Sequence, residues 1–248
     1  MFMFALASAQ DVARLIESSK SLAELAEALG AAANEMGFQR FALMRHPRSI
    51  DTKPSPIQLH NYSREWQEIY DRRRLGLCDP IHRASQHVAD GFRWRDARKF
   101  VPFRDDDEWM LEEAHKYDMA DGYTVAVNVP GEAPGSVTFV TRIDRPFPEQ
   151  MLLYALSFGA MAYQRARIIT GVAHPPRRRL VTDRHAQVLK WMGRNKTDGE
   201  TGMILDISAT TVTKHVRDIC QRFDTYKRTA LPLRAVYEGI LCFEDFFD

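Results

Sequence analysis

Two aromatic side chains and a carboxylate stand close together in the first half of the chain. Trp66 and Tyr70 are four residues apart on one face of a predicted helix, which Ser63 caps, and Asp79-Pro80 follows. Aromatic walls with a few fixed polar groups are typical of pockets that recognise small molecules. The same spacing is common among core aromatics, and Asp-Pro is a frequent turn signal. These residues alone therefore leave a ligand pocket and an ordinary core both open.

A second group of residues whose types and spacing could serve a function lies near the C-terminus. Ser208 is placed to cap a helix, and apolar residues from Val212 to Phe223 repeat at helical spacing. A short helix that ends at Leu205 comes before it, which is the order of a helix-turn-helix. A helical bundle with a solvated basic face would show the same pattern. The opposite face carries side chains that could meet DNA, namely Thr213, Lys214, Arg217 and Arg222.

The distribution of charge favours a nucleic-acid partner for the C-terminal segment only. The whole chain carries 34 basic and 33 acidic side chains, which gives no reason to expect nucleic-acid binding. Residues 1–170 hold 21 basic and 23 acidic side chains, whereas residues 177–234 hold 13 basic and 6 acidic ones. A mildly acidic unit is therefore joined to a basic one, and DNA is the expected partner of the second.

Catalytic and metal-binding motifs are missing from the sequence. There is no Ser/His/Asp motif, histidine-rich run or phosphate-binding glycine loop, and Cys78, Cys220 and Cys242 lack metal-ligand spacing. We therefore expect no enzyme, no cofactor and no metal, and a hydrolase that uses Asp79 as a lone base is the catalytic alternative. No apolar run reaches the roughly 18–20 residues that cross a bilayer, so we expect no membrane partner and a cytoplasmic location.

The elements that must position these residues divide into two domains. Residues 1–170 predict an α+β domain, in which helices flank a mostly antiparallel sheet. Residues 171–179, with two prolines and three consecutive arginines, predict an exposed linker. Residues 180–248 predict an all-α, four-helix domain. The expected strands are residues 38–44, 57–60, 122–129 and 136–142, and residues 45–56 are expected to be loop. The main expected helices are residues 64–74, 105–118, 148–169, 183–192, 198–205, 208–223 and 229–241.

The C-terminal domain closely resembles the LuxR-type helix-turn-helix. The resemblance rests on residues 181–191, Lys196-Thr197, residues 204–208 and Thr211-Val212-x-x-His215, in matching order and spacing. It implies that Thr213, Lys214 and Arg217 read bases. Phosphate contacts, which position the helix without specifying sequence, are implied for Lys196, Thr197, Thr211 and Arg222. His215 is expected to pack and not to catalyse.

Four positions of this domain depart from what favours such a fold. His185 and Asn195 stand where the family usually has glutamate and glycine. Gly199 and Gly202 are expected to weaken the scaffold helix by about 1 kcal/mol each relative to alanine. These departures motivate an alternative function, an interaction protein that forms inactive heterodimers with another LuxR-type regulator.

The N-terminal domain resembles the acyl-homoserine-lactone-binding domain of LuxR-type quorum-sensing regulators. The resemblance covers most of residues 10–170, with the loops matching least. It rests on six positions in the family's order and near its spacing, Trp66, Tyr70, Asp79, Pro80, Trp94 and Gly122.

The resemblance also implies how a lactone would be held. The indole N–H of Trp66 would donate to the lactone carbonyl, Asp79 would accept from the amide N–H, and Tyr62 would donate to the amide carbonyl. Thr124 or Thr141 would assist. Tyr70 and Trp94 would wall the head group, and the acyl chain would follow Ile81, Met110, Met119 and Phe139.

Together the two resemblances predict a transcriptional regulator of quorum-sensing genes that responds to an N-acyl-homoserine lactone. The lactone is expected to stabilise the N-terminal fold, which would dimerise through the helix at residues 148–169. A homodimer would then present two basic helices to an inverted-repeat promoter site.

Overall fold

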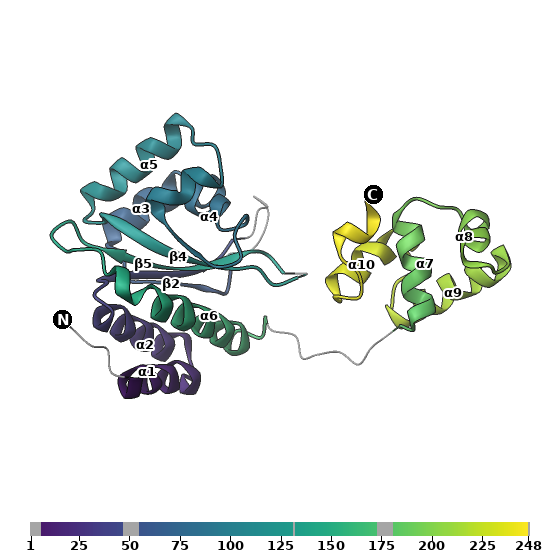
Figure 1. The fold of residues 1–248 in the computed structure, drawn as a ribbon, viewed down its shortest axis with the longest axis horizontal. Coiled ribbons are helices and arrows are strands. Elements are labelled where there is room, and N and C mark those ends of the chain that lie inside the picture. The colour runs from purple at the N-terminus through teal and green to yellow at the C-terminus, as the bar shows by residue number, and fades with distance from the viewer. Residues whose placement is uncertain (1–5, 47–54, 131, 173–180, 248) are drawn as a thin grey trace. The chain divides into compact units, whose positions relative to one another are not determined.

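The computed structural model describes residues 6–46, 55–130, 132–172 and 181–247. The chain forms two compact units, one that ends before residues 173–180 and one that begins after them (Figure 1). Most of the predicted linker at 171–179 and of the predicted loop at 45–56 lies outside the described residues.

An antiparallel sheet of five strands forms the centre of the N-terminal unit, in the order β2-β1-β5-β4-β3. In the central pair, Ala42 lies opposite Thr138 and Met44 lies opposite Ser136. Four of the strands match the predicted β segments to within a few residues, and the short β3 was not expected. The strands are β1 (Arg40–Arg45), β2 (Gln58–His60), β3 (Gly91–Arg93), β4 (Asp121–Val127) and β5 (Gly135–Thr141).

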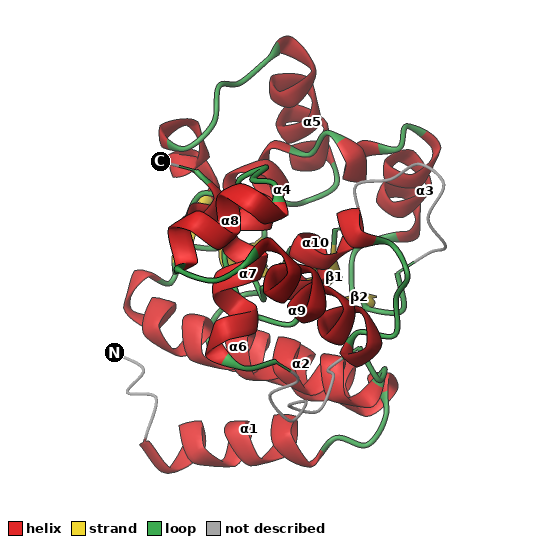
Figure 2. Cartoon of the chain, turned by 90° about the vertical axis from the view of Figure 1, so that its right-hand side faces the viewer, coloured by secondary structure: helices red, strands yellow, loops and turns green. Residues whose placement is uncertain are grey.

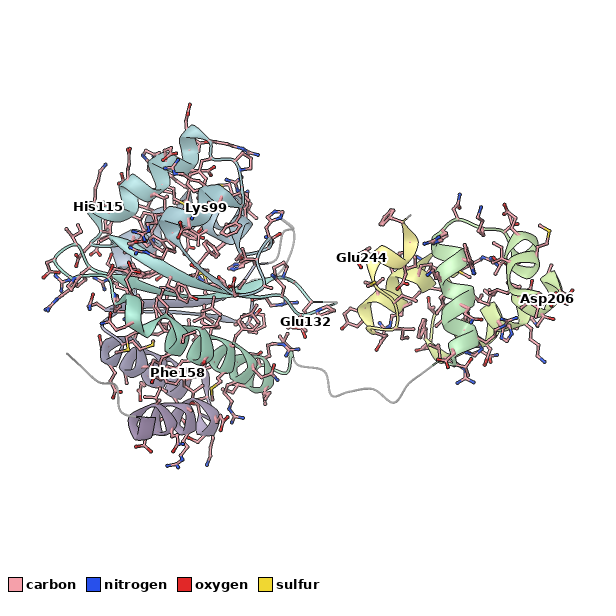
Figure 3. All side chains as sticks on the ribbon, viewed as in Figure 1. Lys99, His115, Glu132, Phe158, Asp206 and Glu244 are labelled. Carbon is pink, nitrogen blue, oxygen red and sulfur yellow. The ribbon has the colours of Figure 1, made fainter. Side chains whose placement is uncertain are left out.

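Two helices, α2 (Leu22–Glu35) and α6 (Leu152–Ile169), cover one face of this sheet, and α1 (Leu6–Ser18) packs on them from outside (Figure 1). Together they enclose the main apolar core of the unit, which includes Phe158, labelled on α6 in Figure 3. The helix α6 approaches closely because it has Gly159 at the contact, where an added Cβ would stand 3.0 Å from Val125. Burial of this face therefore accounts for the long, apolar sequence of α6.

The opposite face of the sheet carries α3 (Arg64–Arg72), α4 (Pro80–Ala84) and α5 (Asp105–Lys116). Strand alternation decides which side chains point to which face. In β5, Val137 and Phe139 belong to the core beneath α6, whereas Val140 packs with the α3 and α5 side chains. Ser136 and Thr138 share the face of Val140.

The C-terminal unit is helical, as Figure 2 shows for α7 to α10. Its core joins Val188 and Leu189 of α7 to Val212, Val216 and Ile219 of α9. The last helix is shorter than the predicted 229–241, because the chain turns at Gly239, whose φ is +67°. The helices are α7 (Asp183–Gly193), α8 (Asp198–Leu205), α9 (Ala209–Arg222) and α10 (Leu231–Tyr237).

The predicted fold class is confirmed: an α+β unit with a mostly antiparallel sheet, followed by an all-α helix-turn-helix unit. Within the described ranges, no helix combines the length and the apolar character that crossing a membrane requires.

Candidate ligand cavity and nucleic-acid interface

A cavity lies between the sheet and the helices α3, α4 and α5, on the face opposite α6. Its floor comes from β1, β2 and β5, and exposed residues such as Gln58 and Asp71 stand where it opens. Met119 lines it as expected. So do seven of the predicted ligand-binding residues, which come from four separate segments: Tyr62, Trp66, Tyr70, Asp79, Ile81, Trp94 and Met110.

Asp79 is fixed in this cavity by the start of α4. Its Oδ1 accepts from the backbone N–H groups of Ile81, at 2.8 Å, and His82, at 3.3 Å, so the carboxylate caps the helix. Pro80 occupies the first helical position, where a missing N–H costs nothing. The Asp-Pro pair therefore aims the other carboxylate oxygen, Oδ2, which accepts from the Tyr70 hydroxyl at 2.8 Å.

Two hydrogen-bond donors in the cavity have no protein acceptor within the described part of the chain. They are the indole N–H of Trp66 and the hydroxyl of Tyr62. Burial, and then the charge of Asp79, raises the pKa of Tyr62 well above its ordinary value, so this phenol keeps its proton. The same two causes raise the pKa of Tyr70. The cavity thus presents these donors and the Asp79 carboxylate against aromatic walls.

Trp94 is held from behind by β4. Its indole N–H donates to Oγ1 of Thr124 at 3.1 Å, and Thr124 is within 2.9 Å of Oγ1 of Thr138. Gly122 provides the space for the ring, because an added Cβ would stand 2.5 Å from Trp94 Cε2. Thr124 is fully buried and does not line the cavity, although it was predicted to contact the ligand. The hydroxyl that reaches the cavity is that of Thr138.

Two other expected contacts point away from the cavity. Thr141 is buried on the other face of β5, where its hydroxyl donates to the backbone carbonyl of Asp121 at 3.0 Å. Phe139 packs in the core beneath α6. Both lie one residue out of phase with Ser136, Thr138 and Val140, and a one-residue step reverses the face of a strand.

Three polar side chains at one end of the cavity were not predicted. Ser136 and His82 line it, and His46 stands behind them, with Nε2 2.9 Å from the Ser136 hydroxyl and its ring stacked on His82 at 3.6 Å. Burial, and then the proximity of His82, lowers the pKa of His46 well below its ordinary value. The small polar residues Ser136 and Thr138, alternating with Val137, were the signal available in the sequence.

The second site is the helix-turn-helix formed by α8 and α9. The turn between them holds Asp206, labelled in Figure 3, in the left-handed region at φ 54°. Gly202 lets the turn fold back onto α8, because an added Cβ there would stand 2.6 Å from the carbonyl oxygen of Ile207. Ser208 then caps α9 by accepting from the N–H of Thr211 at 3.1 Å. The turn therefore requires a glycine at position 202. Position 199 has room for a side chain, so Gly199 only weakens the helix.

The predicted base-reading residues differ in how free their side chains are. Lys214 and Arg217 are exposed on α9 and form no ion pair with the described residues. The Thr213 hydroxyl donates to Asp198 at 2.6 Å. Asp198 is also paired with Arg228, which is the main reason that the pKa of Asp198 is lowered. Arg228 and Asp198 were not anticipated as part of this surface.

The predicted phosphate-contacting residues mostly serve the helix ends. Thr197 caps α8 together with Glu200, whose carboxylate also stands 4.0 Å from Lys196. Thr211 lies in the first turn of α9, and its hydroxyl is 2.8 Å from that of Ser208. Arg222, at the other end of α9, is paired with Asp218 at 3.1 Å.

The two departures from the family pattern fit their surroundings. Nδ1 of His185 accepts from the backbone N–H of Thr182 at 3.2 Å, as a glutamate would in a capping box. Its Nε2 stands 3.1 Å from Asp218, and His215 packs edge-on against its ring at 5.2 Å. Asn195 has φ 59°, a conformation that asparagine tolerates better than most residues other than glycine.

The described residues hold no group of three or more His, Cys, Asp or Glu side chains that could bind a metal ion.

Comparisons with known proteins match both units. Residues 21–166 match the family described as autoinducer binding domain, and residues 179–235 match bacterial regulatory proteins of the luxR family. The chain is 24% identical over 218 residues to the HTH-type quorum sensing-dependent transcriptional regulator RpaR of Rhodopseudomonas palustris, a match that covers 83% of each protein. It is 22% identical over 184 residues to the HTH-type transcriptional regulator y4qH of Sinorhizobium fredii, with 74% of this chain spanning 56% of that protein.

The fold is similar to that of SdiA from Escherichia coli. The crystal structure of SdiA aligns with a TM-score of 0.62 at 19% identity, covering 94% of this chain and 98% of SdiA. A structure of SdiA in complex with octanoyl-rac-glycerol aligns with a TM-score of 0.61 at 17% identity, covering 98% of both chains.

Proposed function

The chain belongs to the LuxR family of quorum-sensing transcriptional regulators with an autoinducer-binding domain, and from this membership we propose that its cavity binds an N-acyl-homoserine lactone. The family is one of regulators and not of enzymes, and its effector is a signal molecule and not a cofactor. The chain carries a DNA-binding helix-turn-helix.

The observation that carries the proposal is the pair of unengaged donors beside a carboxylate in one aromatic cavity. An acyl lactone offers two carbonyl acceptors and one amide N–H. The Trp66 indole donates to the lactone carbonyl, the Tyr62 hydroxyl donates to the amide carbonyl, and Asp79 Oδ2 accepts from the amide N–H. Asp79 retains a lone pair for this after its bonds to Tyr70 and the α4 backbone.

The remaining lining residues provide apolar surface. Tyr70 and Trp94 enclose the head group, Met110 and Met119 add apolar surface in the cluster of Trp66, and Ile81 contacts the acyl chain. Thr138 takes the assisting role proposed for Thr124 and Thr141, because its hydroxyl lies on the cavity face of β5.

On the DNA side, α9 enters the major groove and Lys214 and Arg217 contact base edges, with Thr213 beside them. Lys196, Thr197, Thr211 and Arg222 contact phosphates on either side of the groove. Two copies of α9 would meet the two halves of an inverted repeat. A homodimer supplies them through α6, whose face away from the core includes Leu153, 78% exposed, and Ile168, 51% exposed.

In this proposal, ligand binding promotes DNA binding by stabilising the folded protein. Residues 1–170 sense and dimerise, residues 171–179 link, and residues 180–248 bind DNA. A ligand at a hundred times its dissociation constant stabilises the folded state by about 2.7 kcal/mol, which raises the amount of folded, dimer-competent protein. The inactive-heterodimer alternative is not favoured, since His185 and Asn195, the residues that motivated it, fit the helix-turn-helix.

A reporter strain that lacks its own signal tests the proposal. Asp79→Asn and Trp66→Phe should each raise the lactone concentration needed for a half-maximal response, because each removes one polar contact to the head group. Trp109→Phe is the matched control: Trp109 packs under the Arg73 guanidinium at 4.0 Å and does not line the cavity, so this variant should respond fully.

The result that contradicts the proposal is a lactone dose–response that is unchanged from wild type in both cavity variants. A wild-type chain that responds to a monoacylglycerol and to no lactone would contradict it equally, since SdiA was solved with octanoyl-rac-glycerol.

A further inference from the structure

The strand β5, on the floor of the cavity, indicates which way a bound ligand extends. Thr138 and Ser136 line the cavity in succession along β5, and alternate residues on a strand are about 6.6–6.8 Å apart. At the other end of β5, Val140 belongs to the same apolar cluster as Trp66. Val140 also lies opposite Gly122, against which Trp94 packs, so the two tryptophans mark this end. Ser136 is four residues from Val140, at about 13 Å along the strand by the same spacing. A ligand whose head group binds at Trp66 therefore extends its acyl chain towards Ser136.

The Ser136 end is polar, although it faces the tail of the ligand. Ser136 is 2% exposed and His46, behind it, is 7% exposed, and the two side chains are hydrogen-bonded at 2.9 Å. His82 completes the group, with its ring stacked on His46 and its own polar edge 3.5 Å from both Asp79 and Tyr70. A wall built only for an alkyl chain would be apolar here, since polar groups against hydrocarbon forfeit hydrogen bonds.

The hydrogen-bonding capacity of Ser136 is only partly used. A serine hydroxyl has one donor and two acceptor sites, and His46 occupies one of them. If the imidazole donates, the serine O–H is left for the ligand; if the imidazole accepts, the serine lone pairs are left. A ligand hydroxyl satisfies either arrangement because it both donates and accepts, whereas a ketone can only accept.

We propose that Ser136 and His82 form a subsite for a hydroxyl group on the acyl chain of the signal, so that this chain selects a hydroxylated acyl-homoserine lactone over a plain alkanoyl one. This rests on the proposed function, in which a lactone occupies the cavity. Ser136 makes the direct hydrogen bond, and His82 provides the adjoining polar wall. His46 is a positioning residue that holds Ser136.

The test uses the purified full chain and a series of synthetic lactones. Octanoyl-homoserine lactone is compared with analogues that carry one hydroxyl, at carbon 3, 5 or 7, by isothermal titration. One analogue should bind about five to ten times more tightly than the alkanoyl lactone, the gain expected of one neutral hydrogen bond. Scanning the position of the hydroxyl also measures how far Ser136 lies from the head group.

Variants test whether the tighter binding of the hydroxylated lactone comes from the subsite. Ser136→Ala and His82→Val should each bring the ratio of the two dissociation constants close to one while binding of octanoyl lactone persists. His46→Phe should lower the same ratio, which a purely structural role would leave unchanged. His87→Val, at an exposed histidine close to the C-terminal end of α4, should leave the ratio at its wild-type value.

The outcomes separate this inference from the proposed function. If octanoyl lactone binds and no hydroxylated analogue binds more tightly, the subsite is refuted and the lactone cavity stands. A gain that survives in both Ser136→Ala and His82→Val refutes it in the same way. If no lactone binds the wild-type chain, the proposed function and the subsite fall together.

Discussion

The side chains around the cavity show how single residues fix a recognition site through partners behind it. Trp94 is oriented by Thr124, which never reaches the cavity, and its ring fits only because Gly122 lacks a Cβ. Asp79 is aimed by two backbone N–H groups of α4. Residues that resemble ligand contacts in sequence can therefore act one layer behind the ligand, as Thr124 does.

Acid should destabilise the N-terminal unit through His46. Its pKa in the folded state is lowered by burial and by His82, while the unfolded chain takes up the proton near the ordinary value of about 6.5. Above about pH 6.5, His46 therefore takes nothing from the free energy of unfolding. Below that pH the free energy of unfolding falls, by up to about 1.4 kcal/mol per pH unit for one such group. His60, whose pKa burial also lowers, adds to this slope.

Denaturant titrations between pH 7.5 and 5.5 measure the effect. His46→Gln should reduce the slope of unfolding free energy against pH, because glutamine does not titrate. His87→Gln should keep the wild-type slope, since His87 is exposed. A His46→Gln slope equal to wild type would show that His46 is protonated equally in the folded and unfolded states.

At the scale of elements, the helix caps and the aromatic face of α3 could be predicted from the sequence. Which side chains of β5 point to the cavity could not be predicted. Ser63 and Ser208 cap α3 and α9 as their spacing indicates, because capping is local. Every residue of β5 is buried and both faces of the strand carry a hydroxyl side chain, so residue type alone does not choose Thr138 over Thr141. His46 and His82 meet only through the folding of distant segments, which no local pattern encodes.

The two glycines of α8 give a matched test of this element. Gly199→Ala should stabilise the helix by up to about 1 kcal/mol, since an added Cβ meets nothing closer than Thr197 Oγ1 at 4.0 Å. Gly202→Ala gains the same helix propensity but places a Cβ 2.6 Å from the Ile207 carbonyl oxygen, so it should destabilise the unit.

Amide hydrogen exchange in α8 and α9, followed by mass spectrometry on the full chain, distinguishes the two variants. Exchange should slow in Gly199→Ala and quicken in Gly202→Ala. Equal shifts in both variants would mean that the turn does not need the close approach at Gly202.

For the whole molecule, a net charge near zero conceals two units with different partners. The basic residues 177–234 belong with the helix-turn-helix, and the mildly acidic residues 1–170 with the autoinducer-binding domain. In the proposed function, the signal and the DNA meet different parts of the chain, and regulation begins at the cavity. Binding of a lactone there is the central claim on which dimer formation and DNA contact depend.

Isothermal titration of an acyl-homoserine lactone into the purified full chain tests that claim most directly. We expect saturable binding of one lactone per chain, weakened about 2- to 12-fold in Trp66→Phe and in Tyr62→Phe, as the loss of one hydrogen bond requires, and unchanged in Trp109→Phe. No saturable binding, or an affinity that neither Trp66→Phe nor Tyr62→Phe alters, would contradict the account.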